Sequence, residues 1–125
     1  MAHQVHPCAR VRVTARLPGG ISAAMDRITV ESPAGRTDVV LRRWPAEAWA
    51  EGLVAREAAA LAAIGGHGVP APRLLAKDED GAVTGVRCTL TSALIGQPDF
   101  TPAERQSWLI QLATTQAAIH AVPDN

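Results

Sequence analysis

The chain has 125 residues with 12 basic and 12 acidic side chains, and its zero formal charge excludes the electrostatic excess of a dedicated nucleic-acid or membrane-surface binder. Hydrophobic residues make up 47% of the chain and charged residues 19%, which excludes wholesale disorder and predicts one domain with a buried core. No apolar run approaches the ~20 residues that span a bilayer, and the first residues lack the features of a secretory signal, so we expect a cytoplasmic protein.

The first part of the chain predicts an antiparallel meander. Residues 1–9 are short and polar and are expected to form a flexible amino terminus. Three extended segments follow, at 10–17, 25–31 and 38–44, and short turns that contain glycine join them. The strict alternation in the first of these segments is typical of a strand with one face in water.

The second part of the chain predicts a helix, two more strands and a final helix. Residues 53–64 form the first helix, which Gly65-Gly66 ends, and strands at 72–76 and 86–91 follow. In the final helix Thr101 is expected to cap the first turn, with Pro102 at the first helical position and Glu104 completing a capping box. An apolar stripe then runs along this helix at Trp108, Leu109, Leu112 and Ile119.

Glu57 is the most informative single position, because it lies in the apolar stripe of the first helix between Leu53 and Leu61. Burying a carboxylate without compensation is costly, so Glu57 needs a cationic partner or access to water. The third strand offers Arg42 and Arg43, of which the alternation of a strand sends one toward the helix. The alternative is that Glu57 flanks the stripe and reaches solvent.

The turn between the first two strands, residues 17–22, contains Gly19, Gly20 and Ser22. Glycines allow backbone N–H groups to approach an anion, and the serine adds a hydroxyl donor. The turn matches neither a Walker loop nor a complete GxGxxG motif, so a plain hairpin turn is the competing interpretation. The two cysteines, Cys8 and Cys88, are far apart and show no ligand spacing, so no metal site is expected.

Segments at 39–45, 56–61, 69–76 and 92–96 follow one another along the chain, and Ile119-His120 ends the last helix. In this order and spacing they resemble the amino-terminal lobe of the aminoglycoside phosphotransferase family, the kinase-like small-molecule phosphotransferases that include choline and homoserine kinases. The likeness runs from about Val13 to His120. It implies an α+β fold in which a five-stranded antiparallel sheet with one packed helix forms a protein-kinase-like lobe at 10–92. An inter-lobe linker at 93–100 and the first helix of a larger lobe at 101–121 would follow.

The resemblance also implies a binding site for ATP. Gly19, Gly20 and Ser22 match the loop over the nucleotide phosphates, Arg42 matches the third-strand lysine that holds the phosphates, and Glu57 matches the helix carboxylate that orients it. The linker that meets the adenine edge matches Ser92, Ala93 and Leu94, with Thr91 just inside the pocket. His120 resembles a packing residue rather than a catalytic one.

Two departures from the family pattern limit what is expected of the chain. Arg42 stands where the kinase pattern has lysine, and a planar guanidinium does not superpose on an ammonium. The family's catalytic His-Gly-Asp loop and metal-binding aspartate have no match, so no catalytic residue is assigned and Mg²⁺ is expected only with a larger lobe. This polypeptide is therefore expected to be an incomplete enzyme that binds a nucleotide but does not transfer phosphate.

The expected partners are a nucleotide and, in a complete enzyme, a small molecule with an acceptor hydroxyl, but neither nucleic acid nor a membrane. Self-association, or a second chain that completes the enzyme, is also considered, because a lobe by itself exposes apolar surface. The alternative function is a non-enzymatic α+β module that uses the same scaffold for protein contacts or dimerisation.

Overall fold

The structure is a computed structural model that describes residues 8–18 and 20–124. Most of the expected amino-terminal segment, residues 1–7, and Gly19 of the glycine turn lie outside the described residues. The elements follow in the order β1 (Arg10–Arg16), β2 (Ala24–Ser32), β3 (Gly35–Arg43), a short 3₁₀ turn (Ala48–Ala50), α1 (Leu53–Ile64), β4 (Leu74–Asp78), β5 (Cys88–Ser92) and α2 (Arg105–His120).

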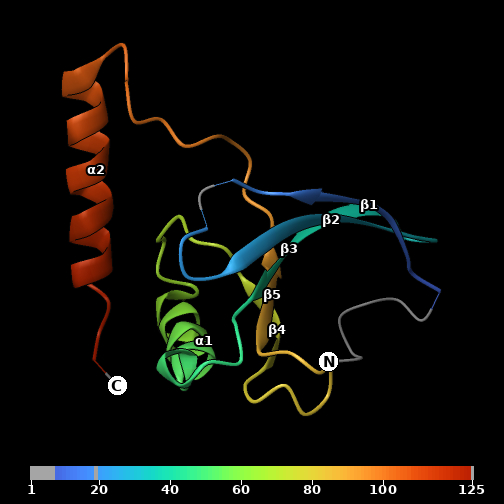
Figure 1. Ribbon diagram of the computed structural model, residues 1–125. Helices are drawn as coiled ribbons and strands as arrows, with labels where there is room; N and C mark the ends of the chain where they lie inside the picture. The colour runs from blue at the N-terminus through green and yellow to red at the C-terminus, as the bar shows by residue number, and fades with distance from the viewer. Residues whose placement is uncertain (1–7, 19, 125) are drawn as a thin grey trace.

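The strands of the described residues form one five-stranded sheet in the order β1-β2-β3-β5-β4 (Figure 1). Every neighbouring pair is antiparallel. β1, β2 and β3 form the predicted meander, and the long connection that contains α1 lets β5 pair with β3 while β4 takes the edge. The predicted α+β architecture, an antiparallel sheet with one packed helix followed by a second helix, is therefore confirmed.

The hairpin between β2 and β3 is tighter than the sequence pattern predicts. Ser32 pairs directly with Gly35, so β3 begins before residue 38, where the alternation becomes clear. Gly35 has φ +126°, a conformation that residues with a side chain rarely adopt. The glycine therefore allows the two strands to extend to the turn itself.

Helix α1 has the predicted bounds, and glycines lie at both of its ends. Gly52, directly before the helix, has φ +77° and lies in the left-handed region, which separates α1 from the preceding 3₁₀ turn. Gly65 follows the last helical residue, and its N–H donates to the carbonyl of Leu61. Gly66, the next residue, has φ +79°, so a glycine in the left-handed region lies beyond each end of the helix.

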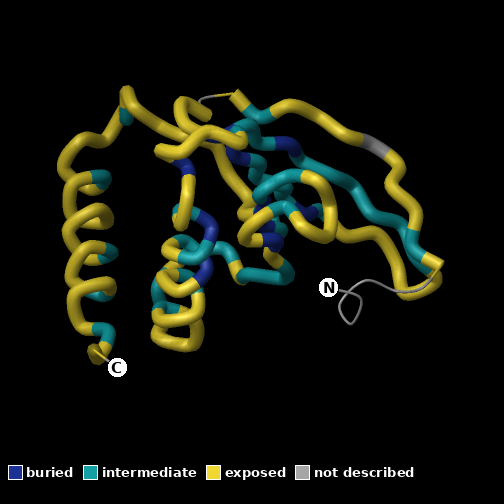
Figure 2. The backbone as a smooth tube through the Cα atoms, turned by 60° about the horizontal axis from the view of Figure 1, so that its bottom comes forward, coloured by how far each residue is buried: buried dark blue, intermediate teal, exposed yellow. Residues whose placement is uncertain are grey.

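The core lies where the end of β3 meets the start of α1. Trp44 is 3% exposed and packs with Ala23, Ala50 and Val54, while Leu53 packs partly against this group. Figure 2 shows the buried segments gathered where the sheet meets α1. The core therefore fixes the helix against the same region of the sheet that holds Arg42.

Helix α2 stands beside the rest of the molecule rather than on the sheet (Figure 1). None of its residues from Arg105 to His120 is buried, and the apolar side chains of Leu109, Leu112 and Ile119 are all at least 43% exposed. Within the described residues, no helix combines the length and the apolar character needed to cross a membrane.

The predicted start of the last helix was wrong. α2 begins at Arg105, its N-cap is Glu104, and that glutamate makes no side-chain capping bond. The N–H of Thr101 instead donates to the carboxylate of Asp99 at 3.2 Å. This local bond holds Thr101 in the preceding loop, so it does not cap the helix.

Candidate functional site

An ion pair joins the sheet to the helix at the predicted place. Nη1 of Arg42, on β3, lies 3.3 Å from Oε1 of Glu57, on α1. The two side chains are 33% and 22% exposed, so both are partly removed from solvent. The predicted contact between a third-strand arginine and Glu57 is confirmed, and the alternative of an unpaired Glu57 in solvent is wrong.

Trp44 supports the Arg42 side of this ion pair. The guanidinium carbon of Arg42 lies 4.8 Å from the centre of the Trp44 ring, within the range of a cation–π contact. Trp44 follows Arg42 by two positions in an extended chain, so the two side chains share a face. The ring thus limits the positions that the guanidinium can take.

Arg42 retains hydrogen-bonding capacity. Its bond to Glu57 uses one Nη atom and one carboxylate oxygen, whereas an arginine–carboxylate pair can form two parallel bonds. Its Nε is buried, and among the described residues it has no hydrogen-bond partner. The contact with Glu57 therefore leaves part of the donor capacity of this guanidinium unused.

The residues at the end of β5 lie along β3, on the side away from the glycine turn. Thr91 is 7% exposed and pairs with Val40, two positions before Arg42. Ser92 pairs with Val39, and its hydroxyl accepts a hydrogen bond from the N–H of Arg73 at 2.8 Å. The group is therefore fixed to the strand that presents Arg42.

The backbone of this group is already partly engaged. The N–H of Ser92 donates to the carbonyl of Arg73 at 2.9 Å, and the N–H of Ala93 donates to the carbonyl of Asp38 at 3.3 Å. Leu94, whose side chain is 54% exposed, follows directly. A ligand that reads backbone groups here would meet Leu94 rather than the N–H groups of Ser92 and Ala93.

The glycine turn lies beside the carboxyl end of β3. Ala24 pairs with Arg43 and Met25 pairs with Arg42, so the residues just before β2 are near these arginines. Gly20 and Ser22 are exposed, while Gly19 lies outside the described residues. A Cβ on Gly20 would lie 2.2 Å from the carbonyl oxygen of Ala23, so this position requires glycine.

The described residues of the predicted site therefore follow a line along β3, with Glu57 reaching it from α1. The Ala93 end is bonded to Asp38, and the Arg42 end is next to the glycine turn. Asp38 and Arg42 are four residue steps apart along the strand, which corresponds to about 13 Å. Of the predicted set, the structure brings Arg42 and Glu57 into direct contact and places the remaining described residues near the two ends of this line.

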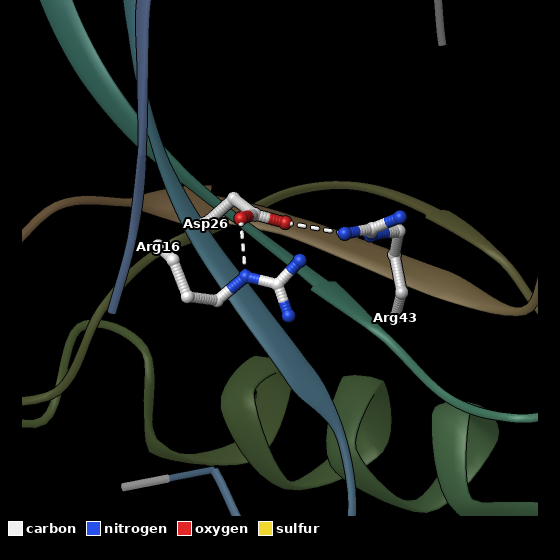
Figure 3. Close-up of polar contacts among 3 residues, drawn as sticks. All are labelled: Arg16, Asp26 and Arg43. Carbon is white, nitrogen blue, oxygen red and sulfur yellow. Dashed lines mark hydrogen bonds and ion pairs between the residues drawn. The ribbon is translucent and has the colours of Figure 1, made fainter. Parts of the chain in front are cut away.

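Sequence reasoning missed a second cluster, on the opposite face of the sheet. Asp26, 6% exposed, accepts hydrogen bonds from Arg16 at 2.8 Å and from Arg43 at 2.6 Å (Figure 3). Burial alone would raise the pKa of Asp26. The hydrogen bonds and charges of Arg43 and Arg16 lower this pKa by more than burial raises it, so it stays below its ordinary value. The available signal was a single carboxylate between two arginines, each at the end of a predicted strand.

The described residues do not provide a site for Mg²⁺. Across residues 8–18 and 20–124, no three His, Cys, Asp or Glu side chains are grouped as a metal site would require.

Comparison with known proteins agrees with the fold. A model of the phosphotransferase enzyme family matches residues 13–125. No curated protein and no solved structure matches the chain significantly. The matched range includes the whole candidate site, from the glycine turn to Leu94.

Proposed function

Because the chain belongs to the phosphotransferase enzyme family, whose kinases use ATP, we propose that residues 10–92 form its nucleotide-binding lobe. The substrate class is a small molecule of the aminoglycoside type, whose hydroxyl would attack the γ-phosphate of ATP in a complete enzyme. Family membership and the position of Arg42 beside Glu57 both support this proposal.

In this proposal the two ends of the line along β3 bind different parts of the nucleotide. Gly19, Gly20, Ser22 and Arg42 hold the phosphates, and Glu57 orients the guanidinium from α1. The adenine lies at the other end, where Thr91 lines the pocket and Ser92, Ala93 and Leu94 form the segment along its edge. The hydrogen bonds of Ser92 and Ala93 fix the position of this segment and leave Leu94 to contact the base.

Phosphate transfer needs groups that these residues do not include. A base must accept the proton of the attacking hydroxyl, and carboxylates must hold the metal ions that neutralise the phosphates. The 125 residues contain no His-Gly-Asp segment. We therefore propose that this polypeptide binds the nucleotide, and we expect negligible phosphotransfer from it in the absence of a larger lobe.

The observation that carries the proposal is the ion pair between Arg42 and Glu57. It consists of a strand arginine with unused donors and a helix carboxylate that holds it, beside a turn that requires glycine. Such an arrangement suits a bound polyphosphate, because the guanidinium meets the charge and the turn allows close approach.

Nucleotide titration tests this function. A ligand at 100 times its Kd stabilises the folded state by roughly 2.7 kcal/mol, so saturating Mg-ATP should raise the Tm. We expect the shift to disappear in Glu57→Ala, because Arg42 loses the group that orients it. Glu51→Ala is the matched control: this exposed residue lies just before α1, and its loss should leave the shift unchanged.

A folded wild-type chain whose Tm responds to neither ATP nor GTP would contradict the proposal. That outcome would support the second candidate function, a non-enzymatic module for protein contacts or dimerisation. The exposed apolar side chains of Leu109, Leu112 and Ile119 on α2 favour this candidate. It predicts association with a second copy or another chain, which sedimentation at increasing protein concentration would detect.

A further inference from the structure

Asp26 is a buried carboxylate that two arginines share. It is the third residue of β2, and each of its oxygens accepts a bond from a different strand. Oδ1 accepts from Nε of Arg16, the last residue of β1, and Oδ2 accepts from Nη2 of Arg43, the last residue of β3 (Figure 3). One side chain therefore ties the ends of both neighbouring strands to the start of β2.

This connection lies at the base of the glycine turn. Arg16 and Asp26 are the last pair in the register of β1 with β2, and the turn leaves the sheet directly beyond them. One residue further toward the turn on each strand, the N–H of Leu17 donates to the carbonyl of Met25 at 2.8 Å. The positions at which the chain enters and leaves the turn are thus fixed by Asp26 and by one backbone bond.

The charges of the cluster do not balance. Two guanidinium groups meet one carboxylate, which leaves an excess of one positive charge beside the turn. Without the carboxylate the two arginines would repel each other, because both are positively charged. An amide in its place can accept a hydrogen bond from one arginine but presents donors to the other. The ends of β1 and β3 would then separate, and the turn would move with them.

We propose that Asp26 is a positioning residue for polyphosphate binding, which acts by holding the ends of β1 and β3 so that Gly20 and Ser22 lie over the phosphates. This inference rests on the proposed function. The cluster on the outer face of the sheet affects the phosphate end of the nucleotide and leaves the base end unaffected.

The test compares the affinities of the chain for ATP and for adenosine. In Asp26→Asn the ATP affinity should fall about tenfold, the usual effect of one lost charge-assisted bond, while the adenosine affinity stays unchanged. Arg16→Gln, a change at a side chain that is 62% exposed, should act in the same direction and provides the test if Asp26→Asn does not fold. Circular dichroism verifies the fold of each variant.

Glu31→Gln is the matched control. Glu31 forms an ion pair with Arg12 on the same two strands, at the end far from the turn, so its loss should alter neither affinity. Wild-type ATP affinity in both folded cluster variants, or an equal loss for ATP and adenosine, would overturn the inference and leave the nucleotide site standing. A wild-type chain that binds neither ligand would instead overturn the proposed function, and this inference with it.

Discussion

Arg42 and Arg43 are neighbours in the sequence, yet they have different partners, because successive side chains of a strand point to opposite faces. Arg42 meets Glu57 and the ring of Trp44 on the face that α1 covers. Arg43 meets Asp26 on the other face. A shift of β3 by one residue would exchange these partners, so the register of a single strand determines which guanidinium faces the helix.

Trp44 connects the candidate site to the core, and its removal should be costly. The side chain is 3% exposed, so Trp44→Ala should lower the free energy of unfolding by about 3–5 kcal/mol, the usual cost of truncating a buried aromatic residue. Trp49 is the control, because it is 52% exposed and Trp49→Ala should cost about 1 kcal/mol or less. Urea denaturation measures both values, and an equal loss of unfolding free energy in the two variants would contradict the burial of Trp44 in the core.

Among the connections between elements, the one from β4 to β5 is organised by the last residue of β4. Asp78 is 4% exposed and accepts hydrogen bonds from the N–H groups of Gly81, Val83 and Thr84 and from the Thr84 hydroxyl. The bonds from Thr84, with those from Val83 and Gly81, outweigh burial and hold the pKa of Asp78 below its ordinary value of 3.8. This loop therefore depends on the ionised form of one carboxylate.

The lowered pKa of Asp78 determines how its contribution to stability changes with pH. Because the folded-state pKa lies below the unfolded one, the stabilisation is complete above pH 3.8 and is lost as the pH falls through the folded-state value. We expect the amide NMR signals of Val83 and Thr84 to change in that acidic range. Asp78→Asn should remove this pH dependence.

Asp80 provides the control within the same loop. It is exposed, and its carboxylate accepts a bond from the N–H of Ala82. Asp80→Asn should leave the acid transition at Val83 and Thr84 where it is in the wild type. A transition that persists in Asp78→Asn, or that moves only in Asp80→Asn, would assign it to a different carboxyl group.

The two helices show which elements could be predicted from the sequence. The bounds of α1 agree with the prediction, and glycines with positive φ lie beyond both ends, Gly52 directly before the helix and Gly66 two residues after it. The start of α2 was misplaced because Asp99 competes for the N–H of Thr101, and a capping pattern does not weigh such a competitor. Local rules are sufficient where no second polar group is in reach.

The same distinction applies to the two ion clusters. Arg42 and Glu57 could be paired in advance, because strand alternation and helical spacing place them on facing surfaces. The burial of Asp26 could not be foreseen, since it arises only when the register of three strands brings Arg16 and Arg43 to one carboxylate. The burial of a residue such as Asp26 depends on the pairing of distant segments rather than on any local sequence pattern.

Over the whole molecule the net charge is zero, but basic and acidic side chains are unevenly distributed along the chain. Residues 10–43, which include β1, β2 and β3, contain seven arginines and three carboxylates, while residues 44–125 contain five basic and nine acidic side chains. The glycine turn and Arg42 lie in the positive part. A polyphosphate therefore meets an attractive potential at the proposed phosphate end, although the chain as a whole is neutral.

This distribution predicts that ATP binding depends on salt. Raising the ionic strength from about 0.05 M to about 0.5 M shortens the screening length to a few ångströms and should slow ATP association severalfold. Stopped-flow measurement of the association rate checks this, with uncharged adenosine as the control, which should be unaffected. Equal rates for ATP at both salt concentrations would show that the charge distribution does not guide the ligand.

Both outer strands of the sheet are irregular, which bears on how copies of the chain meet. The register of β1 skips Arg12, between Val11 and Val13, and the register of β4 skips Leu75, between Leu74 and Ala76. Bulges of this kind disturb the row of backbone groups that an incoming strand would need for pairing. These irregularities disfavour growth of the sheet by edge-to-edge addition, so we expect any self-association to use side-chain surfaces instead of a continuous ladder.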